Sequence, residues 1–195
     1  MLKEFFISLR IFILMLIITG VFYTLAVHYT AQKLFPKEAN GSLILKGSKI
    51  IGSKLIAQKF SSDKYFWSRP SAVDYNGLGS GGSNLSATSK PLQEAIKDRK
   101  ENLEKSGVDT ETGVQRYAPQ DLLSSSASGL DPHISPNSAI YQLNRVIESR
   151  KLNIEEKAKV LKLIKLYTED RDLGILGEQR VNVLLLNKAL DEFFR

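Results

Sequence analysis

The strongest feature of the hydrophobic pattern is an almost unbroken apolar run at Ile11–Val27. Phe5–Leu9, which is apolar except for Ser8, extends this run to the length of a membrane-spanning helix, which needs about 20 apolar residues. Arg10 lies near enough to the edge for its long side chain to carry the charge to the lipid headgroups. The pattern therefore predicts three parts: an N-terminal tail at 1–9, a transmembrane helix at 10–30 and a single soluble domain at 31–195.

A secretory signal peptide is the alternative for this run, because Lys3 and Arg10 precede the apolar stretch. No small-x-small cleavage site follows Val27, and the run is long for a signal peptide, so a retained anchor is favoured. Basic residues nearly balance across the anchor, since Lys33 and Lys37 lie on its other side. The free terminal amine adds a positive charge on the N-terminal side. We therefore expect the N-terminus inside and the rest of the chain outside.

Beyond the anchor, the first patterned stretch is Asn40–Gln58, where the segments SLIL and KIIG flank Lys46 and Gly47. Two short apolar segments around a glycine favour a β-hairpin, because glycine adopts the positive φ that such a turn requires. The aromatic patch at Lys64–Pro70 follows. Its large aromatic side chains, Phe66 and Trp67, are interpreted as anchors of a core or an interface.

Ser71–Ser89 is a low-complexity segment with glycines at 77, 79, 81 and 82. A glycine-rich segment can cradle a phosphate group through its backbone amides. No Gly-Lys-Ser/Thr follows, however, and the segment does not stand between a hydrophobic strand and a helix. The favoured interpretation is a flexible surface loop that docks on another surface.

Pro91 is expected to open a helix that extends to about Lys105. Its apolar positions form a thin stripe, which predicts a peripheral helix: Leu92, Ala95, Ile96 and Leu103. The polar stretch that follows has no apolar period, and it is predicted to be a loop or linker around Gly107, Gly113 and Pro119.

The C-terminal third has the clearest helical periodicity. A helix is predicted from Ser135-Pro136 to Arg150, with one apolar face at Ala139, Leu143, Val146 and Ile147. At 100° per residue, an adjacent polar stripe carries Gln142, Arg145 and Ser149.

Two further helices are predicted after this one. One starts at Asn153, which can form a capping box with Glu156, and its expected buried positions are Ala158, Leu161, Ile164 and Tyr167. The last extends over Val181–Phe194 and is expected to bury Val183, Leu184, Leu186, Leu190 and Phe193. The predicted fold class is α+β: one transmembrane helix, then a soluble domain with a small sheet and about three or four helices.

The amino-acid composition excludes several classes of function. The 195 residues are 43% hydrophobic and 25% charged, which is typical of a globular protein, and the net charge is +6. The basic residues are spread along the helices, so we expect a mild attraction to membrane lipid and no nucleic-acid partner. The chain has no cysteine, which excludes disulfides, thiol catalysis and cysteine-ligated metal.

The best candidate for a catalytic group is His133, with Asp131 and Ser135 close in sequence. Members of a catalytic triad must meet in a defined geometry, which groups this close across Pro132 seldom achieve. The only other histidine, His28, is predicted at the membrane edge, so a multi-histidine metal site within one copy is excluded. The favoured interpretation is an Asp-Pro-His turn with a hydrogen-bonded histidine, and no catalytic or metal site is expected.

Short motifs follow one another behind the anchor: YF-x-x-RPSA at Tyr65–Ala72, SGGSNL at Ser80–Leu85, SASGLDPHIS at Ser126–Ser135, Q-x-x-RV-x-x-x-R at Gln142–Arg150, and RVNVLLLN-x-ALD at Arg180–Asp191. In this order and over nearly the whole chain, they resemble KdpC, the C-subunit family of bacterial Kdp potassium-transporting ATPases. Trp67-Ser68 departs from the His-Gly that is usual in the family, and Lys188 replaces a residue that is commonly apolar.

The resemblance implies a non-catalytic subunit of a high-affinity potassium-uptake complex in the bacterial inner membrane. Its implied partners are a channel-like potassium-selective subunit, a P-type ATPase subunit and a small single-span subunit. This chain lacks the Asp-Lys-Thr-Gly segment that P-type pumps phosphorylate, and it lacks a P-loop. No cofactor is expected to bind tightly.

The resemblance further implies a catalytic chaperone that raises the ATP affinity of the pump subunit and shares its ATP, with Gln142 and Arg145 as nucleotide contacts. The favoured interpretation of the residues themselves is instead that this stripe is the solvent side of an amphipathic helix. ATP is cytoplasmic, so the nucleotide role conflicts with the favoured outward orientation. An outward domain would instead assemble the complex or cap the external entrance of the potassium path.

The expected partner-interface residues are small positions of the anchor and the turn-forming positions of two motifs: Gly20, Ala26, Gly81, Gly82, Ser83, Asn84, Asp131, Pro132 and His133. The competing function class is an anchored extracytoplasmic ligand-binding or hydrolytic protein unrelated to transport. Such a protein should be active alone, whereas a pump subunit should be recovered with large multispanning partners.

Overall fold

The structure is a computed structural model that describes residues 2–104 and 117–194, and it divides the chain into two units, Met1–Ser53 and Lys54–Arg195. The C-terminal end of the helix predicted to reach Lys105, and the linker predicted around Gly107 and Gly113, lie outside the described residues. The two units are described separately below.

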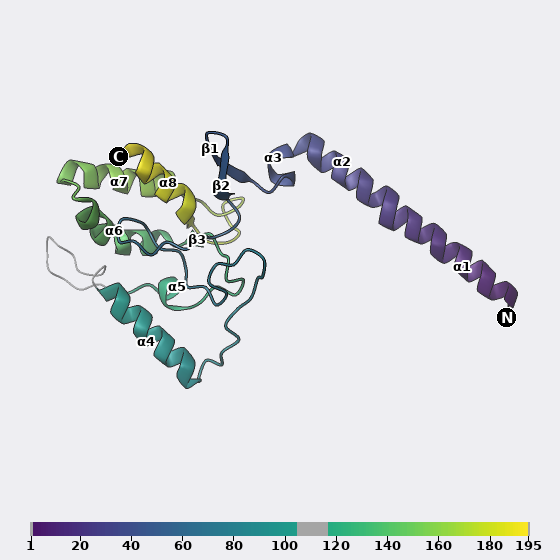
Figure 1. The fold of residues 1–195 in the computed structure, drawn as a ribbon, viewed down its shortest axis with the longest axis horizontal. Helices are drawn as coiled ribbons and strands as arrows, with labels where there is room; N and C mark the ends of the chain where they lie inside the picture. Colours follow the sequence, from purple (N-terminus) through teal and green to yellow (C-terminus); the bar gives the residue numbers. More distant parts are fainter. Residues whose placement is uncertain (1, 105–116, 195) are drawn as a thin grey trace. The chain divides into compact units, whose positions relative to one another are not determined.

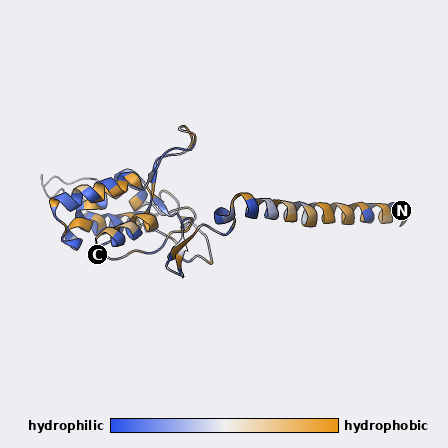
Figure 2. Cartoon of the chain, turned by 90° about the horizontal axis from the view of Figure 1, so that it is seen from above, coloured by the Kyte–Doolittle hydropathy of each residue, from blue (hydrophilic) through white to orange (hydrophobic). Residues whose placement is uncertain are grey.

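The first unit begins with one continuous helix (Figure 1), composed of α1 (Leu2–Ile17), a π-helical turn η1 (Ile18–Tyr23) and α2 (Thr24–Leu34). Its 33 residues span about 50 Å at 1.5 Å per residue, more than the hydrocarbon thickness of a bilayer of about 30 Å. None of its side chains is buried, and Figure 2 shows that its surface is largely hydrophobic. By length and composition this helix can cross a membrane, and it includes residues 2–9 of the predicted tail.

A short helix and a hairpin complete the first unit. After α3 (Pro36–Ala39), the strands β1 (Leu43–Lys46) and β2 (Lys49–Ser53) pair antiparallel, with Lys46 opposite Lys49. Gly47 in the turn has a φ of 64°, the left-handed conformation that favours glycine. The hairpin predicted around Lys46-Gly47 is confirmed.

The second unit contains helices and a small antiparallel sheet. Its helices are α4 (Lys90–Glu104), α5 (Gln120–Leu123), α6 (Pro136–Arg150), α7 (Ile154–Leu166) and α8 (Val183–Phe193). The strands β3 (His133–Ile134), β4 (Thr168–Glu169) and β5 (Arg180–Asn182) form a sheet in the order β3-β5-β4. With the hairpin of the first unit, these elements confirm the α+β fold class.

The core of the second unit lies mainly between α6, α7, α8 and the short sheet (Figure 1). All four apolar positions predicted for α6 are buried: Ala139, Leu143, Val146 and Ile147. Ser135 caps α6 by accepting a hydrogen bond from the Ser138 backbone N–H, and Asn153 and Glu156 form the predicted capping box of α7. Phe66 is fully buried in this core, as the aromatic pattern predicted.

The buried face of α7 was predicted only in part. Val160, Leu163 and Ile164 are buried, whereas Ala158 and Leu161 are exposed. The predicted stripe repeats every three residues, so it turns by about 60° per step around the helix, and its first two positions lie away from the side that carries Val160 and Leu163. The sequence alone could not decide between the two overlapping stripes, because α7 carries more apolar residues than its core-facing side can bury.

The last helix was predicted to begin too early. Arg180–Asn182 forms β5, and α8 begins at Val183 with Asn182 as its cap, accepting a hydrogen bond from the Leu185 backbone N–H. Pairing of β5 with β3 and β4 on both sides overrides the local helical pattern. Phe193, predicted to be buried, is 67% exposed at the end of α8, while the other predicted positions of this helix are buried.

Two long stretches of the second unit, 54–70 and 71–89, contain no helix or strand. The first contributes Ala57, Phe66 and Ser68 to the interior. The second is mostly exposed, as predicted for a surface loop, and Leu78 is 99% exposed. The helix predicted to follow Pro91 is confirmed as α4, in which Leu103 is the buried residue.

Candidate functional site

The motif residues Gln142 and Asn187 hold the backbone of the irregular segment 63–67. The Asn187 side-chain amide accepts a hydrogen bond from the Phe66 N–H and donates one to the Phe66 carbonyl, both at 2.9 Å. Gln142 does the same for Trp67, at 2.7 and 3.2 Å. A primary amide thus replaces a neighbouring strand at each residue, which satisfies backbone groups that have no ladder partner.

Arg145 completes this arrangement, which we call the backbone clamp: the side chains of Gln142, Arg145 and Asn187 bound to the backbone of Asp63–Trp67. Arg145 donates to the Asp63 and Tyr65 carbonyls at 2.9 and 3.0 Å, and to Gln142 Oε1 at 2.7 Å. Its guanidinium carbon lies 3.8 Å from the centroid of the Trp67 ring, in cation–π geometry.

Burial of the clamp overturns one interpretation of its helix. Gln142 is completely buried and Arg145 is 6% exposed, so the stripe predicted as a possible solvent side faces the interior. Burial lowers the pKa of Arg145 to about 10, partly opposed by the carboxylate of Asp63, so the guanidinium stays charged at neutral pH. The nucleotide contact implied for these residues stays a prediction.

A second group of polar contacts surrounds the clamp. Arg150 donates to Asp191 Oδ1 and to the Lys64 carbonyl, both at 2.7 Å. The Tyr65 hydroxyl donates to the other oxygen of Asp191 at 3.0 Å. Burial, followed by the hydrogen bond to Asp191, raises the pKa of Tyr65. Together, α6 and α8 therefore hold this segment through the last residues of two motifs.

The SGGSNL and SASGLDPHIS motifs also meet in the structure. Gly81 N–H donates to the Ser128 carbonyl at 2.9 Å, and an added Cβ at Gly82 would lie 3.1 Å from the Ala127 carbonyl oxygen. Gly129 has a φ of 67°, and a Cβ there would lie 2.6 Å from Val73 Cγ2. These glycines therefore permit a close approach of two backbone segments, while Ser83 and Asn84 are exposed beside them.

The group Asp131, His133 and Ser135 does not form a triad. Ser135 Oγ is used to cap α6 and donates to Ser138 Oγ, and Asp131 forms an ion pair with Arg69 at 3.0 Å. His133 Nδ1 lies 3.7 Å from Asp131 Oδ1, and its buried Nε2 has no hydrogen-bond partner among the described residues. The expectation of a fully hydrogen-bonded histidine is therefore wrong for Nε2, and burial lowers the pKa of His133.

The other expected interface residues lie in different settings. Pro132 is buried, and its carbonyl accepts a hydrogen bond from the Val183 N–H at 3.0 Å. Gly20 lies in the π-helical turn η1 and Ala26 in α2, both exposed on the anchor helix. Thr24 Oγ1 donates to the Gly20 carbonyl at 2.6 Å, so the irregular turn uses a side-chain donor.

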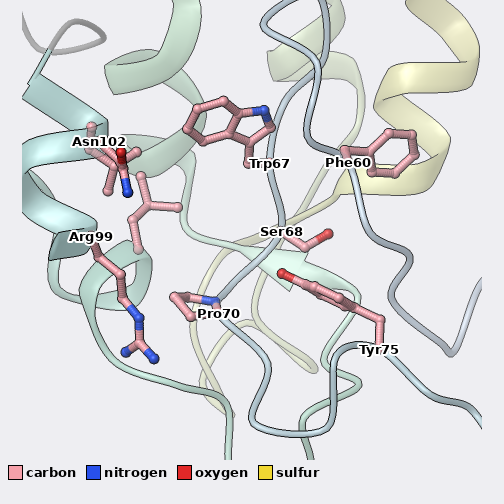
Figure 3. A pocket seen from close by; sticks show the side chains of 9 residues that line it. Phe60, Trp67, Ser68, Pro70, Tyr75, Arg99 and Asn102 are labelled. Carbon is pink, nitrogen blue, oxygen red and sulfur yellow. The ribbon is translucent and has the colours of Figure 1, made fainter. Parts of the chain in front are cut away.

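A pocket of about 210 Å³ opens beside the clamp (Figure 3). Trp67, Ser68 and Pro70 come from the stretch 54–70, and Arg99 and Asn102 come from α4. Arg99 is already engaged, because it donates to the Leu123 carbonyl at 2.7 Å and to Ser125 Oγ at 3.0 Å. The pocket offers aromatic and aliphatic walls, but it does not place a nucleophile beside a base.

The described residues contain no group of three or more His, Cys, Asp or Glu that could hold a metal ion. Most motif residues serve the fold itself: they bind backbone segments, cap helices or allow close packing. The geometry therefore defines a class of protein, an α+β unit behind one apolar helix that can span a membrane, with its polar motifs used mainly for internal support.

Residues 5–192 match the KdpC family, described as "K+-transporting ATPase, c chain". The chain is 46% identical to the potassium-transporting ATPase KdpC subunit of Polynucleobacter asymbioticus, over 94% of this chain and 95% of that protein. It is 44% identical to that of Leptospira interrogans, over 96% and 93%, and 46% identical to that of Methylococcus capsulatus, over 98% of both chains. The chain belongs to the KdpC family, as its motifs indicated.

The sequence reasoning missed Asn187, although it is one of the three side chains of the clamp. The available sign was an amide residue inside the apolar run VLLLN, since a polar residue on a buried helical face must have a partner. Asp121 was also missed. It accepts hydrogen bonds from the Ser135 N–H and the Ser138 hydroxyl, and nothing in the local sequence links α5 to the cap of α6.

Proposed function

We propose that this subunit is a non-catalytic component that helps to assemble the potassium-transporting ATPase, anchored once in the bacterial inner membrane with its second unit on the extracytoplasmic side. The observation that carries the proposal is the use of the motif side chains: Gln142, Arg145 and Asn187 bind the chain's own backbone. Residues committed in this way support a rigid scaffold rather than a reaction. The proposed partners are a P-type ATPase subunit, a channel-like subunit and a small single-span subunit.

The anchor supports a role in assembly, because its apolar side chains are exposed along the whole helix. Small residues let helices approach closely within a membrane. We expect Gly20→Leu to reduce recovery of partner subunits when the tagged chain is purified in detergent, with Val21→Leu as the matched control. An added Cβ at Gly20 meets only Leu16 Cδ1 at 4.0 Å, so this position has room for the Cβ of a larger side chain. Equal recovery with both variants would contradict packing at Gly20.

The side of the membrane can be tested by labelling, because the natural chain has no cysteine. Leu78→Cys introduces a thiol at a 99% exposed loop position. We expect a membrane-impermeant maleimide to label it in cells whose outer layers alone are permeabilised. Labelling only after lysis of the inner membrane would place the second unit inside and contradict the proposal.

The family resemblance implies an effect on the ATP affinity of the pump subunit. A direct contact of ATP with Gln142 and Arg145 would require the Asp63–Trp67 backbone to leave the clamp, since both side chains are buried beneath it. We therefore propose that any such effect acts through binding of this subunit to the pump subunit. The purified full chain should show no saturable ATP binding by calorimetry. Saturable binding that is lost in a folded Arg145→Lys variant would favour direct contact.

A further inference from the structure

The outer side of α7 is unusually apolar and basic for a surface helix. Ile154 is 83% exposed, Leu166 is 74% exposed and Leu161 is 40% exposed. Isolated exposed apolar residues are common, but Ile154 and Leu161 lie on nearly the same face of the helix, seven positions apart, and Leu166 lies at the other edge of its outer side. Together they indicate a contact surface. The core-facing residues Val160, Leu163 and Ile164 are all buried, so these exposed side chains do not belong to the core of this chain.

Lysines alternate with these apolar positions. Lys159, Lys162 and Lys165 are exposed on α7, and Lys151 is exposed just before it. None of these four lysines forms an ion pair within the part of the chain that the structure describes. Glu155 is the exposed acidic residue of this helix, because Glu156 is engaged in the capping box. The outer side of α7 therefore carries a net positive charge.

A groove of about 400 Å³ borders the same helix. Leu161 and Lys165 line it from α7, and Ile140, which is 39% exposed, lines it from α6. Asp170 also lines the groove and accepts a hydrogen bond from Gln179, so the positive charge here comes from the exposed lysines of α7 rather than from the groove itself. We call the groove and the outer side of α7 together the α7 face: Ile140, Lys151, Ile154, Lys159, Leu161, Lys162, Lys165 and Leu166.

We propose that the α7 face binds the surface of an anionic phospholipid bilayer. The positive charge of the lysines complements the headgroups, and the exposed Ile154, Leu161 and Leu166 suit the boundary between headgroups and acyl chains. The connection to the anchor favours this partner, because the stretch from Leu34 to Lys54 spans at most about 70 Å when fully extended. The bilayer surface is therefore always at a high local concentration. The proposal rests on the anchor being inserted in the membrane.

The test uses the full-length chain in lipid nanodiscs, either of pure phosphatidylcholine or with phosphatidylglycerol added. Because the chain has no cysteine, Ala158→Cys places a single spin label on the outer side of α7, and Glu94→Cys places one on α4, elsewhere in the unit (Figure 1). The accessibility of each label to a water-soluble relaxation agent is measured. We expect the α7 label to be several-fold less accessible in the anionic nanodiscs, and added salt to reverse the difference.

Two matched charge variants make the test specific. Replacing Lys159, Lys162 and Lys165 with glutamine should abolish the protection of the α7 label in anionic nanodiscs. Replacing Lys90, Lys97 and Lys100 of α4 with glutamine removes the same charge from another helix and should leave the protection unchanged. Circular dichroism spectra of both variants should match that of the parent chain, which checks that their helical content is unchanged.

Three outcomes would overturn the proposal. Equal accessibility of the α7 label in the two kinds of nanodisc would exclude recognition of anionic lipid. Protection that develops only after the other ATPase subunits are added would assign the α7 face to an acidic protein surface. If the chain did not co-elute with either nanodisc, membrane anchoring itself would be disproved. This outcome distinguishes an error in the proposed function from an error that concerns only the α7 face.

Discussion

The stretches 54–70 and 71–89 both lack helices and strands, yet they behave differently in the fold. The first is buried at Ala57, Phe66 and Ser68, and α6 and α8 supply side-chain partners to its backbone. The second lies mostly on the surface, where water can satisfy its backbone groups. Its contacts with the segment 128–129 are made by Ser71, which donates to the Gly129 carbonyl, and by Ser80 and Gly81, which donate to the Ser128 carbonyl. Irregular backbone is thus stable in a core only where other elements provide polar groups to meet it.

The comparison predicts its largest effect at Phe66, the fully buried ring of the first stretch. Phe66→Ala should lower the free energy of unfolding by about 3–5 kcal/mol, because it removes a large buried side chain and leaves a cavity. Trp67 is the only tryptophan, so its fluorescence reports directly on this region during urea unfolding of the full chain in detergent. Leu78→Ala, the control in the second stretch, should change it by less than about 0.5 kcal/mol. Similar losses for both variants would remove the distinction between the stretches.

Asn187→Leu tests the polar side-chain contacts that support the backbone of the first stretch. The change keeps a side chain of similar size but leaves the N–H and carbonyl of Phe66 buried without partners. We expect a loss of about 2–4 kcal/mol in the free energy of unfolding, since each buried unsatisfied group costs about 1–3 kcal/mol. Gln93→Leu, at an exposed position of α4, is the control. If urea unfolding gave equal midpoints for both variants, backbone support by Asn187 would be disproved.

Gly129→Ala probes the point where the second stretch is held. The residue has a φ of 67°, and a Cβ there would meet Val73 Cγ2 at 2.6 Å and the Gly81 carbonyl at 2.7 Å. We expect a cost of about 1–3 kcal/mol from the strained backbone and the displaced loop. Gly79→Ala, with nothing within 4 Å of an added Cβ, is the matched control. Limited proteolysis should cut 71–89 faster in the first variant only.

The smallest expected effect concerns pH, at the His133 imidazole beside the ion pair between Arg69 of the first stretch and Asp131, which precedes β3. Burial lowers the pKa of His133, opposed by Asp131 and Glu169 and assisted by Arg180 and Lys54. The unfolded chain therefore takes up this proton first as the pH falls below about 6.5, and stability falls with it.

His133→Asn should flatten the pH dependence of the unfolding free energy between about pH 7 and pH 5, where the unfolded histidine titrates. A parent chain whose stability does not fall in this range would show that burial of His133 has no net effect on its protonation.

Local patterns were sufficient for the starts of α6 and α7, whose capping residues match the helical pattern that follows them. Ser135-Pro136 located the start of α6, and Asn153 with Glu156 located that of α7. The hairpin followed from Gly47 for the same reason, because its turn chemistry is contained within adjacent residues. Such features depend on neighbours within four residues, so a single sequence contains the required information.

The candidate site could be predicted only in part. Gln142 and Arg145 were identified from a family motif, but their partners at Asp63–Trp67 lie about 80 residues away along the chain. Periodicity placed both residues on a polar stripe and could not tell an interior stripe from a solvent-facing one. Asn187 was missed because its partner, Phe66, lies 121 residues away.

The sequence by itself determined the apolar helix, the family, the capped helices and the hairpin, because hydrophobic length, motif order and turn chemistry are all properties of local sequence. Only the tertiary structure decided that Arg180–Asn182 is a strand, that α7 leaves Leu161 and Leu166 exposed, and that Gln142 and Asn187 support a buried backbone. Each of these depends on which distant groups meet, and a buried polar group is stable only where such a partner is found.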